Sequence, residues 1–198
     1  MKKLIFTLIT LQSILITSGQ EQELRVLESD STWLKETIKF PLGFAPKLDY
    51  QGYDDVRFSK DWRNPDSDAF FTYAYVWNIN LSILPTVSSI EQDMRLFYDG
   101  LMTAVNRNKD VTVPKTIATF TEIESKKGLP GFNGTLQIYD SFATKKVITL
   151  YANVETQYCA TQKRYVLFFK ISSKTYDHYI WKRFETLKLK ENFCDFKP

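Results

Sequence analysis

The clearest alternation of side chains lies in residues 70–78 (FFTYAYVWN). In a strand, successive side chains point to opposite faces of the sheet. One face of this segment would carry the aromatic residues Phe71, Tyr73, Tyr75 and Trp77. The other face would carry Phe70, Thr72, Ala74 and Val76. Because both faces are largely apolar, we expect a central strand that is covered on both sides.

A helical spacing replaces this alternation over residues 89–106. The apolar residues at that spacing are Ile90, Met94, Phe97, Leu101 and Val105. Ser88 precedes them, and Glu91 follows Ser88 by three residues, which is the order of a capping box. The pattern predicts an amphipathic helix with one buried stripe.

From residue 116 onward, apolar segments alternate with short polar breaks, as in a β-meander. The expected strands are 116–124, 134–142, 146–157 and 164–171. Connections as short as these join antiparallel neighbours. A second helix is expected over about 174–189, from the helical spacing of Tyr176, Ile180, Phe184 and Leu187.

The N-terminal third is less regular. Residues 30–32 (DST) are of the kinds that cap helices, so we expect a short helix to begin near Trp33. Residues 40–46 (FPLGFAP) contain prolines and a glycine, which exclude a helix interior and a central strand. We expect them to run across an edge of the core. A short strand at 56–58 and a turn-rich stretch at 61–68 complete this part.

This order of strands and helices predicts an α+β fold. We expect a twisted antiparallel sheet of about six strands with a helix packed on each face. The element order resembles that of the PsbP/Mog1-like fold, in which such a sheet lies between helices. The alternative is a cystatin-like or NTF2-like cone, with helices on one face only.

Residues 1–19 have the layout of a secretory signal peptide, with two early lysines, an apolar stretch and small residues ending at Gly19. The apolar stretch, residues 4–16, is shorter than the roughly 20 residues that span a membrane. We therefore expect cleavage after Gly19 and a single domain over 20–198 without a transmembrane span. The protein would be exported, to the periplasm or outside the cell.

The chain has two cysteines, Cys159 and Cys194. Export permits a disulfide between them, and the alternative is two reduced, partly buried thiols. Neither cysteine belongs to a CxxC motif, so a redox or zinc site is poorly supported.

Composition and charge remove several classes of function. Without the two lysines of the expected signal, the formal charge of +3 falls to +1, which gives no indication of a nucleic-acid partner. His178 is the only histidine, which excludes the multi-histidine sites usual for catalytic zinc. The chain contains no GxSxG motif and no phosphate-binding glycine loop. We expect no cofactor and no bound metal.

The notable excess is aromatic, with 15 Phe, 11 Tyr and 4 Trp. The candidate ligand-binding residues are Arg57, Trp62, Tyr73, Tyr75 and Trp77. On an open face, such side chains stack on sugar rings or hold an apolar ligand or a peptide. The same residues would equally suit packing beneath a helix, so both interpretations stay open.

Carboxylates are the remaining candidate catalytic groups in the sequence. Those beside the aromatic strand are Asp54, Asp55, Asp66 and Asp68. Paired acids hydrolyse glycosidic bonds only at a defined separation, which a sequence does not show.

Residues 33–80 contain FPLGFAP, then VRF, a turn, and an aromatic strand ending at Trp77. This combination resembles the N-terminal half of uncharacterised exported proteins common in the Bacteroidetes. The resemblance implies export from a bacterial cell and no established activity. The expected signal peptide, the missing catalytic constellation and the aromatic strand favour a non-enzymatic protein that binds a ligand or an envelope protein, peptide or glycan, or assists an envelope assembly. The alternatives are a hydrolase acting on glycans or esters, and a stress or structural protein without a small ligand.

Overall fold

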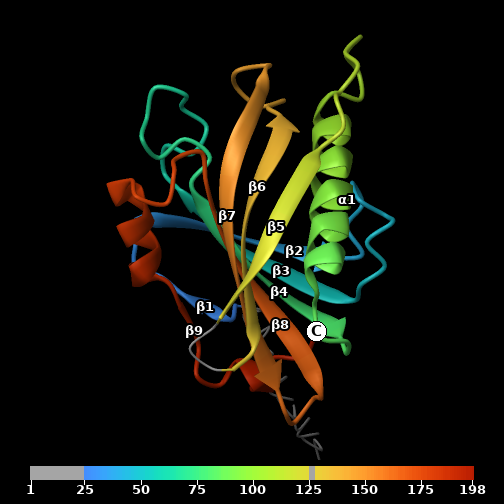
Figure 1. The fold of residues 1–198 in the computed structure, drawn as a ribbon, viewed down its shortest axis with the longest axis vertical. Coiled ribbons are helices and arrows are strands. Elements are labelled where there is room, and N and C mark those ends of the chain that lie inside the picture. The colour runs from blue at the N-terminus through green and yellow to red at the C-terminus, as the bar shows by residue number, and fades with distance from the viewer. Residues whose placement is uncertain (1–24, 125–127) are drawn as a thin grey trace, which may run out of the picture.

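The computed structural model describes residues 25–124 and 128–198. These residues form a seven-stranded antiparallel sheet, a small two-stranded sheet, one α-helix and two 3-10 helices (Figure 1). This confirms the expected α+β class. The expected signal peptide, residues 1–19, lies outside the described residues.

The large sheet is built from two groups of strands that meet at its centre. In spatial order its strands are β2 (Trp33–Phe40), β3 (Gly52–Ser59), β4 (Tyr73–Leu81), β8 (Arg164–Ser172), β7 (Val147–Cys159), β6 (Pro130–Tyr139) and β5 (Ile117–Glu124). Consecutive hairpins account for both groups, since β2 to β4 and β5 to β8 each form a meander. The pairing of β4 with β8 joins the groups, and it makes β4 a central strand as the sequence predicts.

The two faces of β4 enter two separate clusters of buried side chains. Tyr73, Tyr75 and Trp77 belong to the larger cluster, together with residues of the α-helix. Ala74 and Val76 belong to the smaller cluster on the opposite face. The predicted alternation is therefore confirmed from Tyr73 to Trp77, and both faces of the strand are covered. Phe70 and Phe71 precede the strand and both enter the larger cluster, so the prediction that they lie on opposite faces is wrong.

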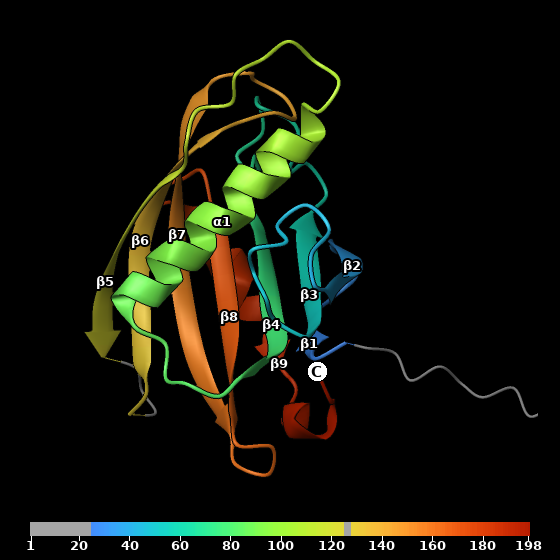
Figure 2. The same cartoon turned by 90° about the vertical axis from the view of Figure 1, so that its right-hand side faces the viewer.

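The α-helix, α1 (Val87–Val105), lies diagonally across one face of the sheet (Figure 2). Its capping box is formed by Thr86 and Ser89, and not by Ser88 and Glu91 as expected. The buried stripe runs through Ile90, Asp93, Met94, Phe97, Tyr98 and Met102. Leu101 and Val105 are only half-buried, because Tyr98 and Met102 occupy the buried side of the last turns.

The segment between β2 and β3 packs against α1. A side chain at Gly100 would overlap the carbonyl oxygen of Phe44, so this position of the helix requires glycine. The Tyr50 hydroxyl donates a hydrogen bond to Asp93 of α1 at 2.8 Å. The segment therefore runs along the edge of the core, as its prolines predict.

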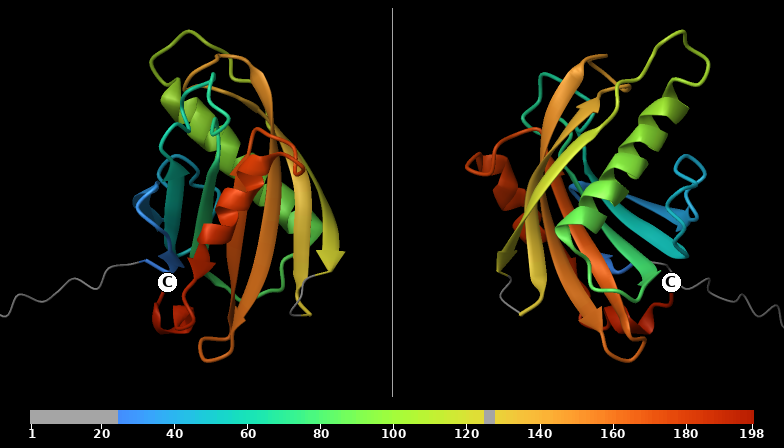
Figure 3. Two further views of the ribbon diagram at one scale, coloured as in Figure 1. Left: turned by 90° about the vertical axis from the view of Figure 1, so that its left-hand side faces the viewer. Right: turned by 45° about the vertical axis from the view of Figure 1, so that its right-hand side comes forward.

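The face opposite α1 carries the C-terminal part of the chain (Figure 3). Its elements are η1 (Tyr179–Thr186), β9 (Lys188–Leu189) and η2 (Phe193–Asp195), with β1 (Leu27–Glu28) paired to β9. The expected long α-helix over 174–189 is wrong. His178 caps a 3-10 helix of eight residues, and the pairing of β9 with β1 ends the helical stretch.

The short helix expected near Trp33 is also wrong, because residues 33–40 are the edge strand β2. Every residue of this strand is in register with a residue of β3. Asp30 accepts a hydrogen bond from the backbone of Thr32 within a turn, at 2.8 Å. Asp30 therefore stabilises a turn before a strand and does not cap a helix. Asp and Thr are common in turns as well as at helix ends, so the sequence signal was ambiguous.

The two cysteines form a disulfide between the end of β7 and η2, with Cα atoms 5.4 Å apart. This confirms the predicted pair Cys159–Cys194. Within the described residues, no helix is long and apolar enough to cross a membrane. The disulfide is compatible with an exported protein.

Candidate functional site

A cavity of about 360 Å³ lies between α1, strands β2 to β4 and the loop that follows β3. We call it the aromatic cavity. The aromatic side chains that line it include Phe58, Trp62, Phe71, Tyr73, Tyr75 and Phe142. Its polar lining residues are Glu36, Asp54 and Arg63. A volume of this size falls within the range of small-molecule sites.

The strand register places these side chains on one wall. Val56 lies opposite Tyr75, and Phe58 lies opposite Tyr73, so the four side chains share the α1 face of β3 and β4. The loop after β3 then folds Trp62 back onto Phe58, with ring centroids 4.7 Å apart. A cavity wall of stacked rings results.

The tyrosine hydroxyls are used within the protein. The hydroxyls of Tyr73 and Tyr98 are hydrogen-bonded at 2.5 Å, and the Tyr75 hydroxyl donates to the sulfur of Met94 at 3.4 Å. The rings are therefore held in place by α1, and they present carbon surface to the cavity. The aromatic residues of β4 therefore fit both interpretations in part. They pack beneath α1, and two of them, Tyr73 and Tyr75, also border the aromatic cavity.

Trp62, Tyr73 and Tyr75 are the candidate ligand-binding residues that the structure brings together. Trp77 lies farther along β4, fully buried against Phe169 with ring centroids 5.0 Å apart, and it does not line this cavity. Arg57 lies on the opposite face of the sheet, because it alternates with Val56 and Phe58 along β3. The structure therefore brings three of the five candidate residues together at this cavity and places Arg57 and Trp77 elsewhere.

Arg57 is part of a buried network that holds the N-terminal strand. It is ion-paired with Asp55, and its Nε donates to the Ser29 hydroxyl at 3.0 Å. Asp55 accepts hydrogen bonds from the backbone nitrogens of Val26 and Leu27, both at 2.8 Å. These charges are compensated by β1 and its neighbours, so they anchor the chain and face no cavity on the α1 side.

Asp54 is the exceptional group of the aromatic cavity. It is 1% exposed, and its Oδ1 has no hydrogen-bond partner in the part of the chain that the structure describes. Burial raises the pKa of Asp54 well above its usual range, and the charges of Asp55 and Glu36 act in the same direction. The nearby indole of Trp77 acts in the opposite direction. Burial therefore favours the protonated, uncharged form of this carboxyl group.

The other candidate acids lie away from the cavity. Asp66 is exposed in the loop after β3, and Asp68 of the same loop is ion-paired with Lys174 at 3.1 Å. Asp68 also accepts a hydrogen bond from the Tyr179 hydroxyl at 2.6 Å. Sequence reasoning missed Glu36, because a lone glutamate on an edge strand carries no distinguishing pattern.

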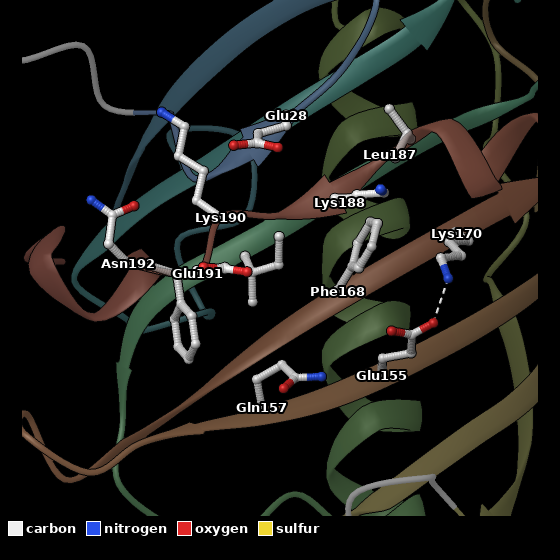
Figure 4. Close-up of a pocket in the computed structure, with 12 residues that line it drawn as sticks. Glu28, Glu155, Gln157, Phe168, Lys170, Leu187, Lys188, Lys190, Glu191 and Asn192 are labelled. Atoms are coloured by element: carbon white, nitrogen blue, oxygen red, sulfur yellow. Dashed lines mark hydrogen bonds and ion pairs between the residues drawn. The ribbon is translucent and has the colours of Figure 1, made fainter.

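A second hollow, the charged groove, lies on the opposite face beneath β9 and η2, and has a volume of about 1000 Å³ (Figure 4). Its charged lining residues are Glu28, Glu155, Lys170, Lys188, Lys190 and Glu191. Lys170 and Glu155 form an ion pair across its floor. The groove mixes both signs of charge, and the described residues place no unpartnered buried polar side chain in it. We therefore take the aromatic cavity as the candidate site.

Among residues 25–124 and 128–198, no cluster of His, Cys, Asp and Glu side chains is arranged to hold a metal ion. The chemistry of the site rests on stacked rings and the buried carboxyl group of Asp54. Comparisons with protein-family models, curated proteins and solved structures find no match to this chain.

Proposed function

We propose that this chain is an exported, non-enzymatic protein that binds a ligand with an apolar body in the aromatic cavity. The observation that carries the proposal is the hollow itself. It is a partly open hollow of about 360 Å³ lined mostly by apolar and aromatic side chains with a few polar groups, which is the usual form of a small-molecule site. A hydrogen-bonded sheet and a helix supply much of its wall, together with loop residues such as Trp62 and Phe142, so the hollow is formed without a ligand.

The wider setting is part of the same proposal. The resemblance of residues 33–80 to exported Bacteroidetes proteins supports a role in the envelope or outside the cell. The ligand-binding face would then be the α1 side of a layered, PsbP/Mog1-like arrangement, with α1 on one face and η1 on the other. The disulfide supports an oxidising compartment.

The binding of N-phenyl-1-naphthylamine tests the proposed site, because this neutral aromatic probe fluoresces in apolar surroundings. Leu101→Trp would fill the cavity from α1, since Leu101 lines it. Gln92→Trp would add the same indole at an exposed position of the same helix, as a matched control. We expect saturable binding to the native protein and to Gln92→Trp, and its loss in Leu101→Trp.

Near-ultraviolet circular dichroism would establish that Leu101→Trp remains folded. Equal probe binding by the native protein and a folded Leu101→Trp variant would refute this cavity as the site. An absence of saturable binding to the native protein would refute a preformed apolar site.

A second candidate function is a hydrolase acting on glycans or esters, and one observation favours it. Glu36 and Asp54 line the same cavity. Glu36 is in register with Val56 and Ile38 with Asp54, so the two acids are diagonal neighbours on paired strands. The backbones of diagonal neighbours lie roughly 7–8 Å apart, so their side chains can bring two carboxyl groups to the roughly 5–9.5 Å separation of paired-acid catalysis.

Hydrolysis of p-nitrophenyl acetate and p-nitrophenyl β-glucoside would separate the two functions. A hydrolase would lose turnover in both Asp54→Asn and Glu36→Gln. A binding protein would show only a background rate that neither substitution changes, which is the result we expect.

A further inference from the structure

The unpartnered carboxyl group of Asp54 indicates what kind of ligand the aromatic cavity takes. Most buried polar groups in proteins are hydrogen-bonded, so one without a partner calls for an explanation. The indole of Trp77, in register with Asp54 on β4, interacts with the Asp54 carboxyl group, but neither its Nε1 nor the Oδ1 of Asp54 has a hydrogen-bond partner of normal geometry among the described residues. A polar end is therefore built into an otherwise apolar hollow.

The titratable groups that act on Asp54 are acids and tyrosines, and its partner in register on β2 is the apolar Ile38. Asp55 adjoins it on β3, and Glu36 lies on the neighbouring strand β2. The remaining titratable or polar groups that interact with it are Trp77, Tyr73 and Tyr75 of β4 and Tyr98 of α1. The charged groups that act on Asp54 are thus carboxylates.

The cationic lining residue, Arg63, belongs to the opposite end of the cavity. Asp54 and Phe58 are four residues apart on β3, which corresponds to about 13 Å of strand, and Trp62 stacks beyond Phe58. The guanidinium of Arg63 lies 4.5 Å from the Trp62 ring centroid. This contact shows that the aromatic wall already accepts a cation on its face.

We propose that the aromatic cavity binds an organic amine, with the ammonium group between Asp54 and Glu36 and the apolar remainder against the rings of Phe58, Tyr73 and Tyr75. This inference rests on the proposed function and names its ligand class. Carboxylates and aromatic faces both attract ammonium groups, and here they line a single hollow. The ammonium would supply the partner that Asp54 lacks.

Proton release accompanies this pairing. Burial favours the uncharged form of Asp54 and an ammonium partner favours the charged form, so pairing would shift the carboxyl group toward its charged form and send its proton to solvent. Amine affinity should therefore rise with pH until Asp54 is ionised in the free protein or the amine itself loses its charge.

Three probes with the same naphthalene body test the ligand class by displacing N-phenyl-1-naphthylamine. They are 1-naphthylmethylamine, 1-naphthalenemethanol and 1-naphthoate. We expect the native protein to bind the amine about tenfold more tightly than the alcohol, as for a charge-assisted hydrogen bond, and the anion most weakly. Asp54→Asn should bring the amine and the alcohol to similar affinity while N-phenyl-1-naphthylamine still binds.

Glu36→Gln provides a second variant at an exposed position, where the fold does not depend on the side chain. It should lower the preference for the amine in part. Asp66→Asn, in the exposed loop after β3, is the matched control and should leave the preference unchanged. Calorimetry in buffers of different ionisation enthalpy should detect proton release with the native protein and none with Asp54→Asn.

Equal binding of the alcohol and the amine, or tighter binding of the anion, would overturn the amine proposal while leaving an apolar binding site in place. The same conclusion would follow from an amine preference that persists in both Asp54→Asn and Glu36→Gln. If N-phenyl-1-naphthylamine itself fails to bind, the proposed function fails and the amine proposal fails with it.

Discussion

Replacing Asp93 with asparagine is expected to stabilise this protein at neutral pH. Asp93 occupies a buried position on α1, where it accepts the hydrogen bond of the Tyr50 hydroxyl. Burial raises the pKa of Asp93 from 3.8 to about 6, and the Tyr50 hydrogen bond opposes this shift. The folded protein therefore holds a proton over a pH range in which the unfolded chain has released it.

The size of the stability change follows from the difference between the pKa of Asp93 in the folded protein and its pKa in the unfolded chain. A shift of about two pKa units corresponds to about 3 kcal/mol, at 1.36 kcal/mol per unit. Because the folded-state pKa is the higher one, this stability is fully present below pH 3.8 and is lost as the pH rises through about 6. Asparagine keeps an acceptor for Tyr50 and remains uncharged. The stability of Asp93→Asn relative to the native protein should therefore increase by about 3 kcal/mol between about pH 3.5 and about pH 7.5.

Urea unfolding followed by tryptophan fluorescence, with the disulfide intact, measures the free energy of unfolding of the native protein and of Asp93→Asn at each pH. Asp66→Asn removes a carboxylate from an exposed loop and should change stability by no more than about 0.5 kcal/mol at either pH. A stability difference between Asp93→Asn and the native protein that is the same at both pH values would refute the reasoning. A larger destabilisation at the higher pH would refute it as well.

Three further predictions concern the disulfide, the glycine at position 100 of α1 and the expected signal peptide. Replacing both Cys159 and Cys194 with serine should lower the free energy of unfolding by about 4 kcal/mol, since the disulfide closes a loop of 35 residues; an unchanged urea midpoint would contradict this. Gly100→Ala should destabilise the protein by roughly 1–3 kcal/mol in spite of alanine's higher helix propensity, whereas Gly43→Ala, which meets no atom within 4 Å, should not; thermal unfolding of both variants decides the point. Expressed with its N-terminus in a bacterial host, the exported chain should begin at Gln20, and intact-mass spectrometry of the periplasmic or extracellular fraction would show a different start or no export if the signal-peptide prediction is wrong.

Local periodicity predicted the elements whose surroundings agree with their pattern. The strand around Tyr75 and the helix around Phe97 each repeat their apolar residues over several turns or pleats, so neighbours in sequence alone specify them. The errors came where local signals conflict. Residues 30–32 suggest a helix start, but the following residues pair along their whole length with β3. The segment after His178 has helical spacing, but its end is taken by pairing with β1.

The sequence predicted only those residues of the candidate site that share a face within one strand. Tyr73 and Tyr75 share a face by alternation within one strand, which a sequence reveals. Whether Asp54 or Arg57 of β3 joins that face depends on the register between two strands, and register is a tertiary property. Glu36 enters the cavity through the pairing of a third strand.

By itself, the sequence determined the central aromatic strand, the amphipathic helix that covers it, the C-terminal meander and a cysteine pair able to bridge. These follow from periodicities of two and 3.6 residues, which act over short stretches of chain. Only the tertiary structure decided that the helix leaves a hollow over Tyr73 and Tyr75 while sealing Trp77, and that an acid lines this hollow without a partner. The physical reason is that a cavity is a property of how surfaces from several elements fit together, and no single element's pattern records that fit.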